Sequence, residues 1–295
     1  MAEECYSRGH AVAVFAGEHK GDLNGIHVTS DQEILFDKWD LIVVHGGDVS
    51  VQDMVLNNAE KLVSPVLFML IKPSHSLTYT HAMKFCKYIG CSTHEDWEFV
   101  RRFNRFYKSE KVRHGITTWS KARQDFNFRE KYNITTPYMF VSSGGFWPNK
   151  AFHELIEVFN KADRKDITLV LTGYDNRHNL MPKEQDNIRV MMLDDRKEVL
   201  QAISEADLYI MHSHSEGFGL VLLESMMNHT PWAARYIAGA RLMSDYGFTY
   251  TRDDALIDYI KNFKPVDLKT VGDNYRFVME NHLISNTVDD ILELV

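Results

Sequence analysis

Short apolar runs alternate with amphipathic stretches along the whole chain, which is the pattern of parallel β-sheets joined by crossover helices. In the first half, the apolar runs predict strands at residues 10–16, 40–45, 65–71, 88–91 and 111–113. The stretches between them predict helices at residues 51–62, 77–87 and 95–107. We therefore expect a first Rossmann-like domain over residues 1–120.

The second half repeats this alternation after a stretch in which charged residues dominate. Residues 117–136 are predicted to connect two domains, and the second domain is expected over residues 136–280. The final residues 286–295 have the apolar spacing of a helix. The second domain is predicted to have strands at 138–142, 167–172, 188–192, 207–211 and 231–235, with helices at 150–161, 196–205 and 218–228.

The fold class expected from this pattern is α/β, with two Rossmann-like parallel-sheet domains. The 295 residues are 44% hydrophobic and 25% charged, which suits two soluble domains. A net charge of -8 argues against nucleic acid as a partner. The most basic stretch, 101–113, is interpreted as an exposed helix face, and the alternative is a site for an anionic acceptor or peripheral contact with a membrane surface.

No apolar run reaches the roughly 20 residues that a membrane-spanning helix needs, and no secretory signal is recognised at the start of the sequence. The cysteines Cys5, Cys86 and Cys91 have no metal-ligand spacing. They are interpreted as free thiols in a reducing compartment, so a cytoplasmic location is expected.

The segment 207–235 is the richest in candidate chemistry. An apolar strand is followed by Glu216-Gly217-Phe218-Gly219 and then by an apolar helix that contains Glu224. The glycines allow backbone N–H groups to approach a ligand, and a helix start favours an anion, so a diphosphate is expected here. A buried Glu224 would be costly without a partner. Ribose hydroxyls would supply one, and the structural alternative is a salt bridge to a neighbouring helix.

The segment 138–159 has the second candidate loop. A predicted strand is followed by Gly144 and Gly145, and a helix is expected to begin near Lys150. A loop of small residues before a helix start suits phosphate, and Lys150 would add a positive charge. Taken alone, the segment could equally be an ordinary strand-to-helix turn with a surface lysine.

These two segments together resemble the donor-binding half of the retaining glycosyltransferase family 4, the glycosyl transferases group 1. The resemblance is carried by the stretch from Glu216 to Leu220, by Glu224 after Leu223, and by a proline and small apolar strand at residues 231–234. It implies the GT-B fold, in which two Rossmann-like domains face a cleft. It also implies that residues 281–295 cross back onto the N-terminal domain.

The resemblance implies the transfer of a sugar from a nucleotide-sugar donor to a glycan or other hydroxyl acceptor, with retention of configuration. No metal and no cofactor would be needed. By similarity, Glu216 would lie beside the transferred sugar and Glu224 would hold the ribose. The backbone of Gly217, Phe218, Gly219 and Leu220 would bind the diphosphate, together with Gly144, Gly145 and Lys150. The catalytic residues expected are Glu216 and His75.

Four features differ from the family pattern. Gly145 stands where the family has an arginine that pairs with the lysine, so this phosphate partner is missing or is supplied by Arg177, Arg235 or Arg241. Thr117 replaces a common acidic residue. His75 comes a few residues later than the family histidine, and the sequence begins within the family's first helix. These differences favour an alternative hypothesis, a degenerate nucleotide-binding module without turnover. An epimerase or a phosphorylase on the same architecture is a further alternative.

His212 and His214 alternate along a predicted loop, which would place both side chains on the same side as candidate metal ligands. The sequence shows no third ligand beside them, so no metal site is predicted.

Overall fold

The computed structural model describes residues 1–15, 20–45, 57–58, 61–70, 85–103, 108–175 and 179–295. These residues form two compact units. Unit 1 comprises Met1–Gly115 and Asn281–Val295, and unit 2 comprises Ile116–Glu280.

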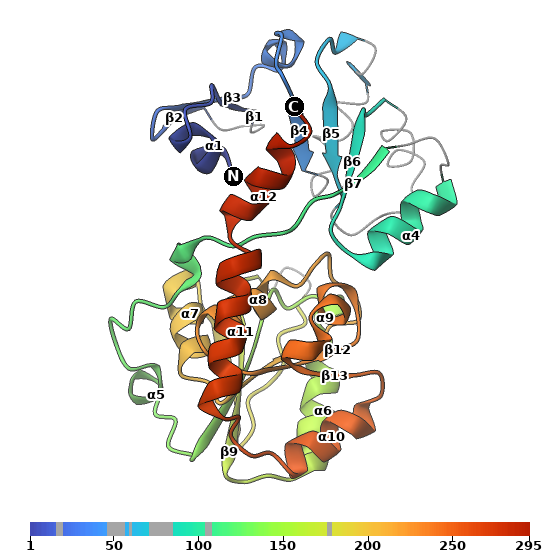
Figure 1. Cartoon of the computed structure of the whole chain (residues 1–295). Coiled ribbons are helices and arrows are strands. Elements are labelled where there is room, and N and C mark those ends of the chain that lie inside the picture. Colours follow the sequence, from blue (N-terminus) through green and yellow to red (C-terminus); the bar gives the residue numbers. More distant parts are fainter. Residues whose placement is uncertain (16–19, 46–56, 59–60, 71–84, 104–107, 176–178) are drawn as a thin grey trace. The chain divides into compact units, whose positions relative to one another are not determined.

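Unit 2 is built on one sheet (Figure 1). This sheet has six strands in the order β10-β9-β8-β11-β12-β13. Every neighbouring pair of its strands is parallel, as the alternation of apolar runs and helices predicts. The strands are β8 (Tyr138–Ser143), β9 (Ile167–Gly173), β10 (Ile188–Met192), β11 (Leu208–Met211), β12 (Trp232–Arg235) and β13 (Phe248–Tyr250).

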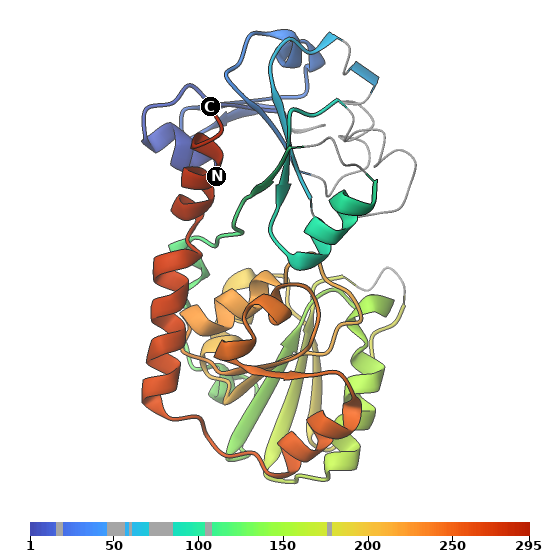
Figure 2. The same cartoon turned by 45° about the vertical axis from the view of Figure 1, so that its right-hand side comes forward.

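Helices cover both faces of this sheet (Figure 2). On one face, α6 and α10 pack against each other and place residues such as Leu155 and Ile260 against Phe140 and Leu169 of the strands. On the other face, α7 contacts β8 and α8 contacts β11 and β12. The helices of unit 2 are α5 (Phe128–Lys131), α6 (Phe152–Ala162), α7 (Arg196–Ser204), α8 (Leu220–Met227), α9 (Ala238–Leu242), α10 (Asp253–Lys261) and α11 (Leu268–Asn281, whose last residue belongs to unit 1).

Unit 1 contains two sheets. The four-stranded sheet has the order β4-β5-β6-β7 and is entirely parallel. The three-stranded sheet has the order β1-β3-β2, with β3 parallel to β1 and antiparallel to β2. The strands are β1 (Ala13–Phe15), β2 (Gly21–Leu23), β3 (Ile26–Thr29), β4 (Ile42–His45), β5 (Val66–Met69), β6 (Tyr88–Cys91) and β7 (Lys108–Lys111), and the helices are α1 (Ala2–Ser7), α4 (His94–Phe103) and α12 (Ile284–Leu292).

The C-terminal helix α12 is fixed to the rest of unit 1 by ion pairs. Arg113 bonds Asp290 at 2.5 Å through Nη2, and Arg8 bonds Asp289 at 2.6 Å through Nη1. Gly115 is required at this point, because a Cβ there would lie 2.3 Å from the carbonyl oxygen of Leu283. None of the helices in the described part of the chain is long and apolar enough to cross a membrane.

Most predicted strands are confirmed to within a few residues. The strands β2, β3 and β13 and the helices α5, α9, α10 and α11 were not predicted. The three missed strands have only three or four residues, too few to show a period. The predicted helices 51–62 and 77–87 lie largely outside the described residues. The segment 116–136 packs within unit 2, where Ala122 N donates to Asn228 Oδ1 at 2.7 Å and Phe128 N to Glu205 Oε1 at 2.7 Å.

Candidate functional site

The loop after β8 requires glycine at both predicted positions. Gly144 has φ +149°, and a Cβ there would lie 2.9 Å from Cε of Lys150. At Gly145 a Cβ would lie 2.5 Å from Cε2 of Trp147, whose indole Nε1 donates to Asp175 Oδ2 at 3.1 Å. The space beside Gly145, where the family has an arginine, is therefore filled by the Trp147 ring.

Lys150 does not begin a helix, which corrects the predicted boundary. It ends the short 3-10 helix η4 (Pro148–Lys150), and Ala151 adopts a left-handed conformation with φ 52° before α6 starts at Phe152. This break turns the lysine side chain toward the loop after β11. Its Nζ lies 2.6 Å from Oε1 of Glu216, and the two side chains are only 16% and 14% exposed.

Backbone contacts hold the two loops together at this ion pair. His214 N donates to the carbonyl oxygen of Asn149 at 2.8 Å, and Asn149 Nδ2 donates to the carbonyl oxygen of Ser215 at 3.2 Å. The carboxyl ends of β8 and β11 are neighbours in the sheet, which brings these segments together. Lys150 and Glu216 are thus joined at one point of the sheet edge.

The helix that follows Glu216 begins later than predicted. The α8 helix starts at Leu220, and Gly219 is its N-cap with φ +89°, a left-handed conformation that favours glycine. Glu216 therefore lies on the loop and not on the same helix as Glu224. Phe218 is buried, and its carbonyl oxygen accepts a hydrogen bond of 2.9 Å from Gly239 N.

Glu224 lies in α8 with a side chain that is 9% exposed. Burial raises the pKa of its carboxyl, and Arg196 beside it acts in the opposite direction. Arg196 Nη2 contacts Oε1 of Glu224, so the structural alternative, a salt bridge to a neighbouring helix, is present. Burial also raises the pKa of Tyr209 in β11, and the charges of both Glu216 and Glu224 add to that effect.

A second polar cluster, which the sequence did not predict, surrounds Arg235 at the end of β12. Its Nη2 donates to Glu154 Oε2 at 2.9 Å, to Asp253 Oδ1 at 3.2 Å and to His212 Nε2 at 2.8 Å. Its Nη1 lies 3.1 Å from His214 Nδ1. These side chains come from α6, α10 and the loop after β11, so only the tertiary structure brings them together.

Three members of this cluster could ligate a metal ion. Ligand atoms of Glu154, His212 and Asp253 lie within 4.8 Å of one another. The guanidinium of Arg235 already contacts all three, and its charge compensates the two carboxylates. His214 lies beside the group and bonds Glu154 Oε1 at 2.6 Å.

The side chain of His212 is fully buried. Its Nδ1 atom is hydrogen-bonded to the Tyr250 hydroxyl at 2.6 Å. Burial is the main cause that lowers the pKa of His212 to about 3, and the positive charge of Arg235 is the second cause. The folded state therefore holds His212 neutral at pH values where an unfolded chain, with a histidine pKa of about 6.5, binds a proton.

Acid is consequently expected to destabilise the protein through His212. Its contribution is complete above about pH 6.5 and is lost as pH falls toward 3, by up to about 1.4 kcal/mol per pH unit. Urea unfolding between pH 7 and pH 4.5 should show a smaller decline for His212→Asn than for the wild type. His153→Asn, which removes an exposed histidine of α6, is the control, and an unchanged slope in the His212 variant would contradict this assignment.

The remaining predicted residues fall elsewhere. His75 and Arg177 lie outside the described residues. The guanidinium of Arg241, a candidate phosphate partner, lies 5.3 Å from the centroid of the Tyr236 ring.

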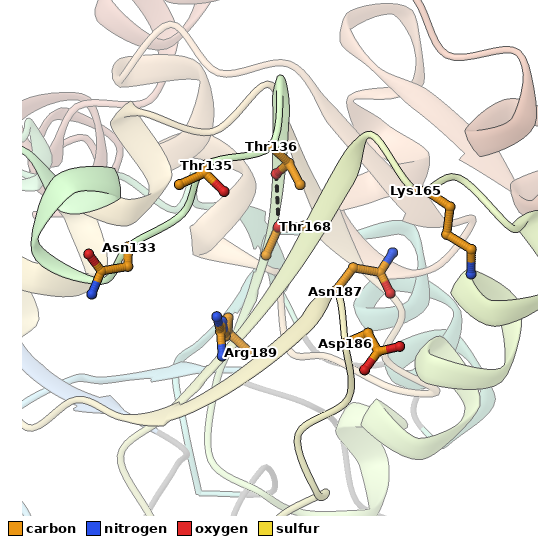
Figure 3. A pocket seen from close by; sticks show the side chains of 8 residues that line it. All are labelled: Asn133, Thr135, Thr136, Lys165, Thr168, Asp186, Asn187 and Arg189. Atoms are coloured by element: carbon orange, nitrogen blue, oxygen red, sulfur yellow. Dashed lines mark hydrogen bonds between the residues drawn. The ribbon is translucent and has the colours of Figure 1, made fainter.

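A small polar cavity of about 280 Å³ lies in unit 2 at the amino ends of β8, β9 and β10. The Thr136 and Thr168 hydroxyls are hydrogen-bonded to each other in its lining (Figure 3). It is at the opposite sheet edge from Lys150 and Glu216.

Comparison with known proteins finds a family model that matches the segments of the candidate site. Residues 124–247 match the glycosyl transferases group 1. An uncharacterized 41.2 kDa protein in the cps region of Klebsiella pneumoniae is 31% identical over 122 residues, which are 41% of this chain and 32% of that protein. The match thus spans less than half of the length of either chain.

Solved structures match over most of the chain. Sucrose-phosphate synthase of Thermosynechococcus elongatus has a TM-score of 0.77 at 15% identity, over 99% of this chain and 90% of that one. HepE of Anabaena, solved with UDP and glucose, has a TM-score of 0.71 at 16% identity, over 87% of this chain and 77% of that one.

WaaG, a glycosyltransferase involved in lipopolysaccharide biosynthesis, has a TM-score of 0.68 at 16% identity, over 98% of this chain and 92% of that one. At these identities the likeness shows the fold. The protein therefore has the GT-B fold. Its residues 124–247, which contain the Lys150–Glu216 pair and Glu224, match the glycosyl transferases group 1.

Proposed function

We propose that the protein is a retaining glycosyltransferase of family 4 that transfers a sugar from a nucleotide-sugar donor to a hydroxyl acceptor. The observation that carries this proposal is the Lys150–Glu216 ion pair, 2.6 Å long, beside the start of α8. It places a cation, a carboxylate and the N–H groups of the first turn of α8 at the sheet edge where ligands of such folds bind.

Each group has a distinct role in the proposed reaction. When the bond between the anomeric carbon and the diphosphate breaks, negative charge grows on the leaving diphosphate. Lys150 and the N–H groups at Gly219 and Leu220 would stabilise that charge, which lowers the barrier. The acceptor hydroxyl forms the new bond at the anomeric carbon, and Glu216 would contact the transferred sugar. His75 stays a predicted catalytic residue.

Glu224 is proposed to bind the ribose of the donor. The Glu224 side chain is 9% exposed, so its carboxylate has lost most of its hydrating water. Hydroxyl groups of a ribose would replace the lost hydrogen bonds and stabilise the buried charge. The names of the similar proteins support this choice of ligand, since HepE was solved with UDP and glucose. WaaG acts in lipopolysaccharide biosynthesis, which supports a glycan as the acceptor.

Neither a metal nor a cofactor is part of the proposed mechanism. Lys150 would supply the positive charge on the diphosphate, and the guanidinium of Arg235 lies within the cluster that could hold an ion. None of the three described cysteines, Cys5, Cys86 and Cys91, forms a disulfide, which supports a reducing, cytoplasmic setting.

Calorimetric titration with UDP, GDP and their sugar conjugates tests the donor site. We expect one nucleotide to bind with micromolar affinity and Glu224→Ala to weaken that binding at least tenfold, because the ribose loses a buried acceptor. Glu157→Ala, on the exposed side of α6, is the control. Wild-type protein that binds none of these ligands would refute the proposal.

The second candidate is a nucleotide-binding module without turnover. Its supporting observation is at Gly145, where the Trp147 ring fills the space of the family's arginine. Arg235, which was considered as a substitute, is bonded to Glu154 and Asp253. Release of free nucleoside diphosphate from the bound donor, in the presence of glycan acceptors, distinguishes the enzyme from the module.

A further inference from the structure

Arg196 lies at the same sheet edge as the proposed donor site. It is the first residue of α7, shortly after the carboxyl end of β10. Its guanidinium contacts Oε1 of Glu224, and the two side chains differ greatly in exposure, 64% for Arg196 and 9% for Glu224. The pair thus consists of a buried anion and a cation that faces solvent.

The position of Arg196 is not explained by the stability of its own helix. The N-terminus of a helix carries partial positive charge, so a cation in the first turn is unfavourable. Arg196 and Lys197 both occupy the first turn of α7, after the N-cap Asp195 whose Oδ1 accepts from Lys197 N at 2.8 Å. The contact with Glu224 offsets this unfavourable placement.

Other charged groups near α8 are directed elsewhere. Glu198 of α7 is bonded to Lys131 and Tyr132, and Arg235 of β12 is bonded to Glu154 and Asp253. The hydroxyl of Tyr209 in β11 lies 2.9 Å from Ser143 Oγ, and burial raises its pKa, so this group stays neutral. Within the described part of the chain, Arg196 is the cation that compensates Glu224.

The contact leaves half of the carboxylate available. Arg196 bonds Oε1, and Oε2 has no hydrogen-bond partner among the described residues. An ionised carboxylate accepts stronger hydrogen bonds than a neutral one, whereas a protonated carboxyl turns one oxygen into a donor. Anything that keeps Glu224 ionised therefore favours hydroxyl ligands.

We propose that Arg196 is a positioning residue for the donor nucleotide: it fixes Oε1 of Glu224, keeps the carboxylate ionised and leaves Oε2 to the ribose hydroxyls. This inference rests on the proposed function. Arg196 need not touch the ligand, because its effect passes through Glu224. Without the guanidinium, a proton would compete with the ribose for the carboxylate.

The test compares UDP and GDP affinities of wild type, Arg196→Met, Arg196→Lys and Lys197→Met from pH 5.5 to pH 8.5. We expect Arg196→Met to weaken binding about tenfold at pH 5.5 and by less than threefold at pH 8.5, because the loss grows as the carboxylate takes up a proton. Arg196→Lys should recover most of the affinity. Lys197→Met removes one positive charge from the same exposed turn and should change affinity by less than twofold at every pH.

A ligand-free readout separates this inference from the proposed function. Carboxyl-carbon NMR of glutamate-labelled protein, with Glu224 identified by its absence in Glu224→Gln, should show the pKa of Glu224 higher in Arg196→Met than in wild type. An equal pKa, equal affinity, or tighter binding in Arg196→Met would overturn the positioning role. If the carboxyl titrations differ but wild type binds no nucleotide, the proposed function fails and the pair is structural only.

Discussion

Replacing Lys150 with methionine is expected to lower turnover by about 10²–10³-fold, the loss typical when one preorganised group that stabilises transition-state charge is removed. Methionine keeps the unbranched side chain that packs against Gly144 but has no charge. The ammonium lies 2.6 Å from Glu216 and is 16% exposed, so water screens it poorly. Release of nucleoside diphosphate from the donor that titration identifies measures the effect.

Two further variants separate chemistry from folding in this experiment. Lys150→Met leaves the partly buried Glu216 without its partner, which is itself destabilising. The double variant Lys150→Met/Glu216→Gln should regain stability but not turnover. Lys165→Met removes a lysine whose side chain is 81% exposed and should leave the rate unchanged. A Lys150→Met enzyme with more than one third of the wild-type rate would contradict the role of Lys150.

Replacing Gly239 with alanine is expected to have the largest effect on the folded donor site. A Cβ there would lie 2.3 Å from the carbonyl oxygen of Phe218, a backbone atom that cannot rotate away. The added methyl group must displace the loop Glu216–Gly219. We expect a loss of about 1–3 kcal/mol in the free energy of unfolding and at least tenfold weaker nucleotide binding, measured by thermal unfolding and by titration.

Gly272→Ala is the control, and its expected effect on the free energy of unfolding is opposite to that of Gly239→Ala. A Cβ at Gly272 meets no atom within 4 Å, and the residue lies inside α11. Alanine there should stabilise the protein by about 0.5–1 kcal/mol, since glycine is disfavoured in helix interiors. A Gly239→Ala protein as stable as wild type would show that the loop after β11 can shift freely.

Much of the fold could be predicted from local pattern, because buried parallel strands are continuous apolar runs. The strands β6 and β10 have the predicted bounds, and β8, β9, β11 and β12 differ from prediction by one residue at one end. The predicted strand 111–113 was displaced, since β7 spans Lys108–Lys111. This edge strand has the polar sequence KSEK, which carries no apolar signal, and its pairing with β6 defines it.

The candidate site was predicted as a set of segments but not as a geometry. The glycines at 144, 217 and 219 and the acidic residues Glu216 and Glu224 stand in a recognisable order along the chain. Their distances could not be predicted. The predicted helix starts were also misplaced, because Ala151 and Gly219 take left-handed conformations just before α6 and α8. Local propensity does not predict such a conformation for an alanine.

The Arg235 cluster left only one signal in the sequence, the alternation of His212 and His214. Its members, Glu154, His212, Asp253 and Tyr250, are scattered over four elements, and each is unremarkable alone. A parallel sheet places the carboxyl ends of all its strands at one edge, so residues far apart in sequence meet there.

The sequence by itself determined the alternation of strands and helices, and it supplied the loops and residues that are proposed to bind a diphosphate. Hydrophobic period and backbone freedom are local properties, and they can be read from neighbouring residues. Only the tertiary structure decided that Lys150 pairs with Glu216, that Arg196 compensates Glu224 and that Trp147 fills the space beside Gly145. Those contacts depend on strand order and on side-chain packing between elements, which no local pattern encodes.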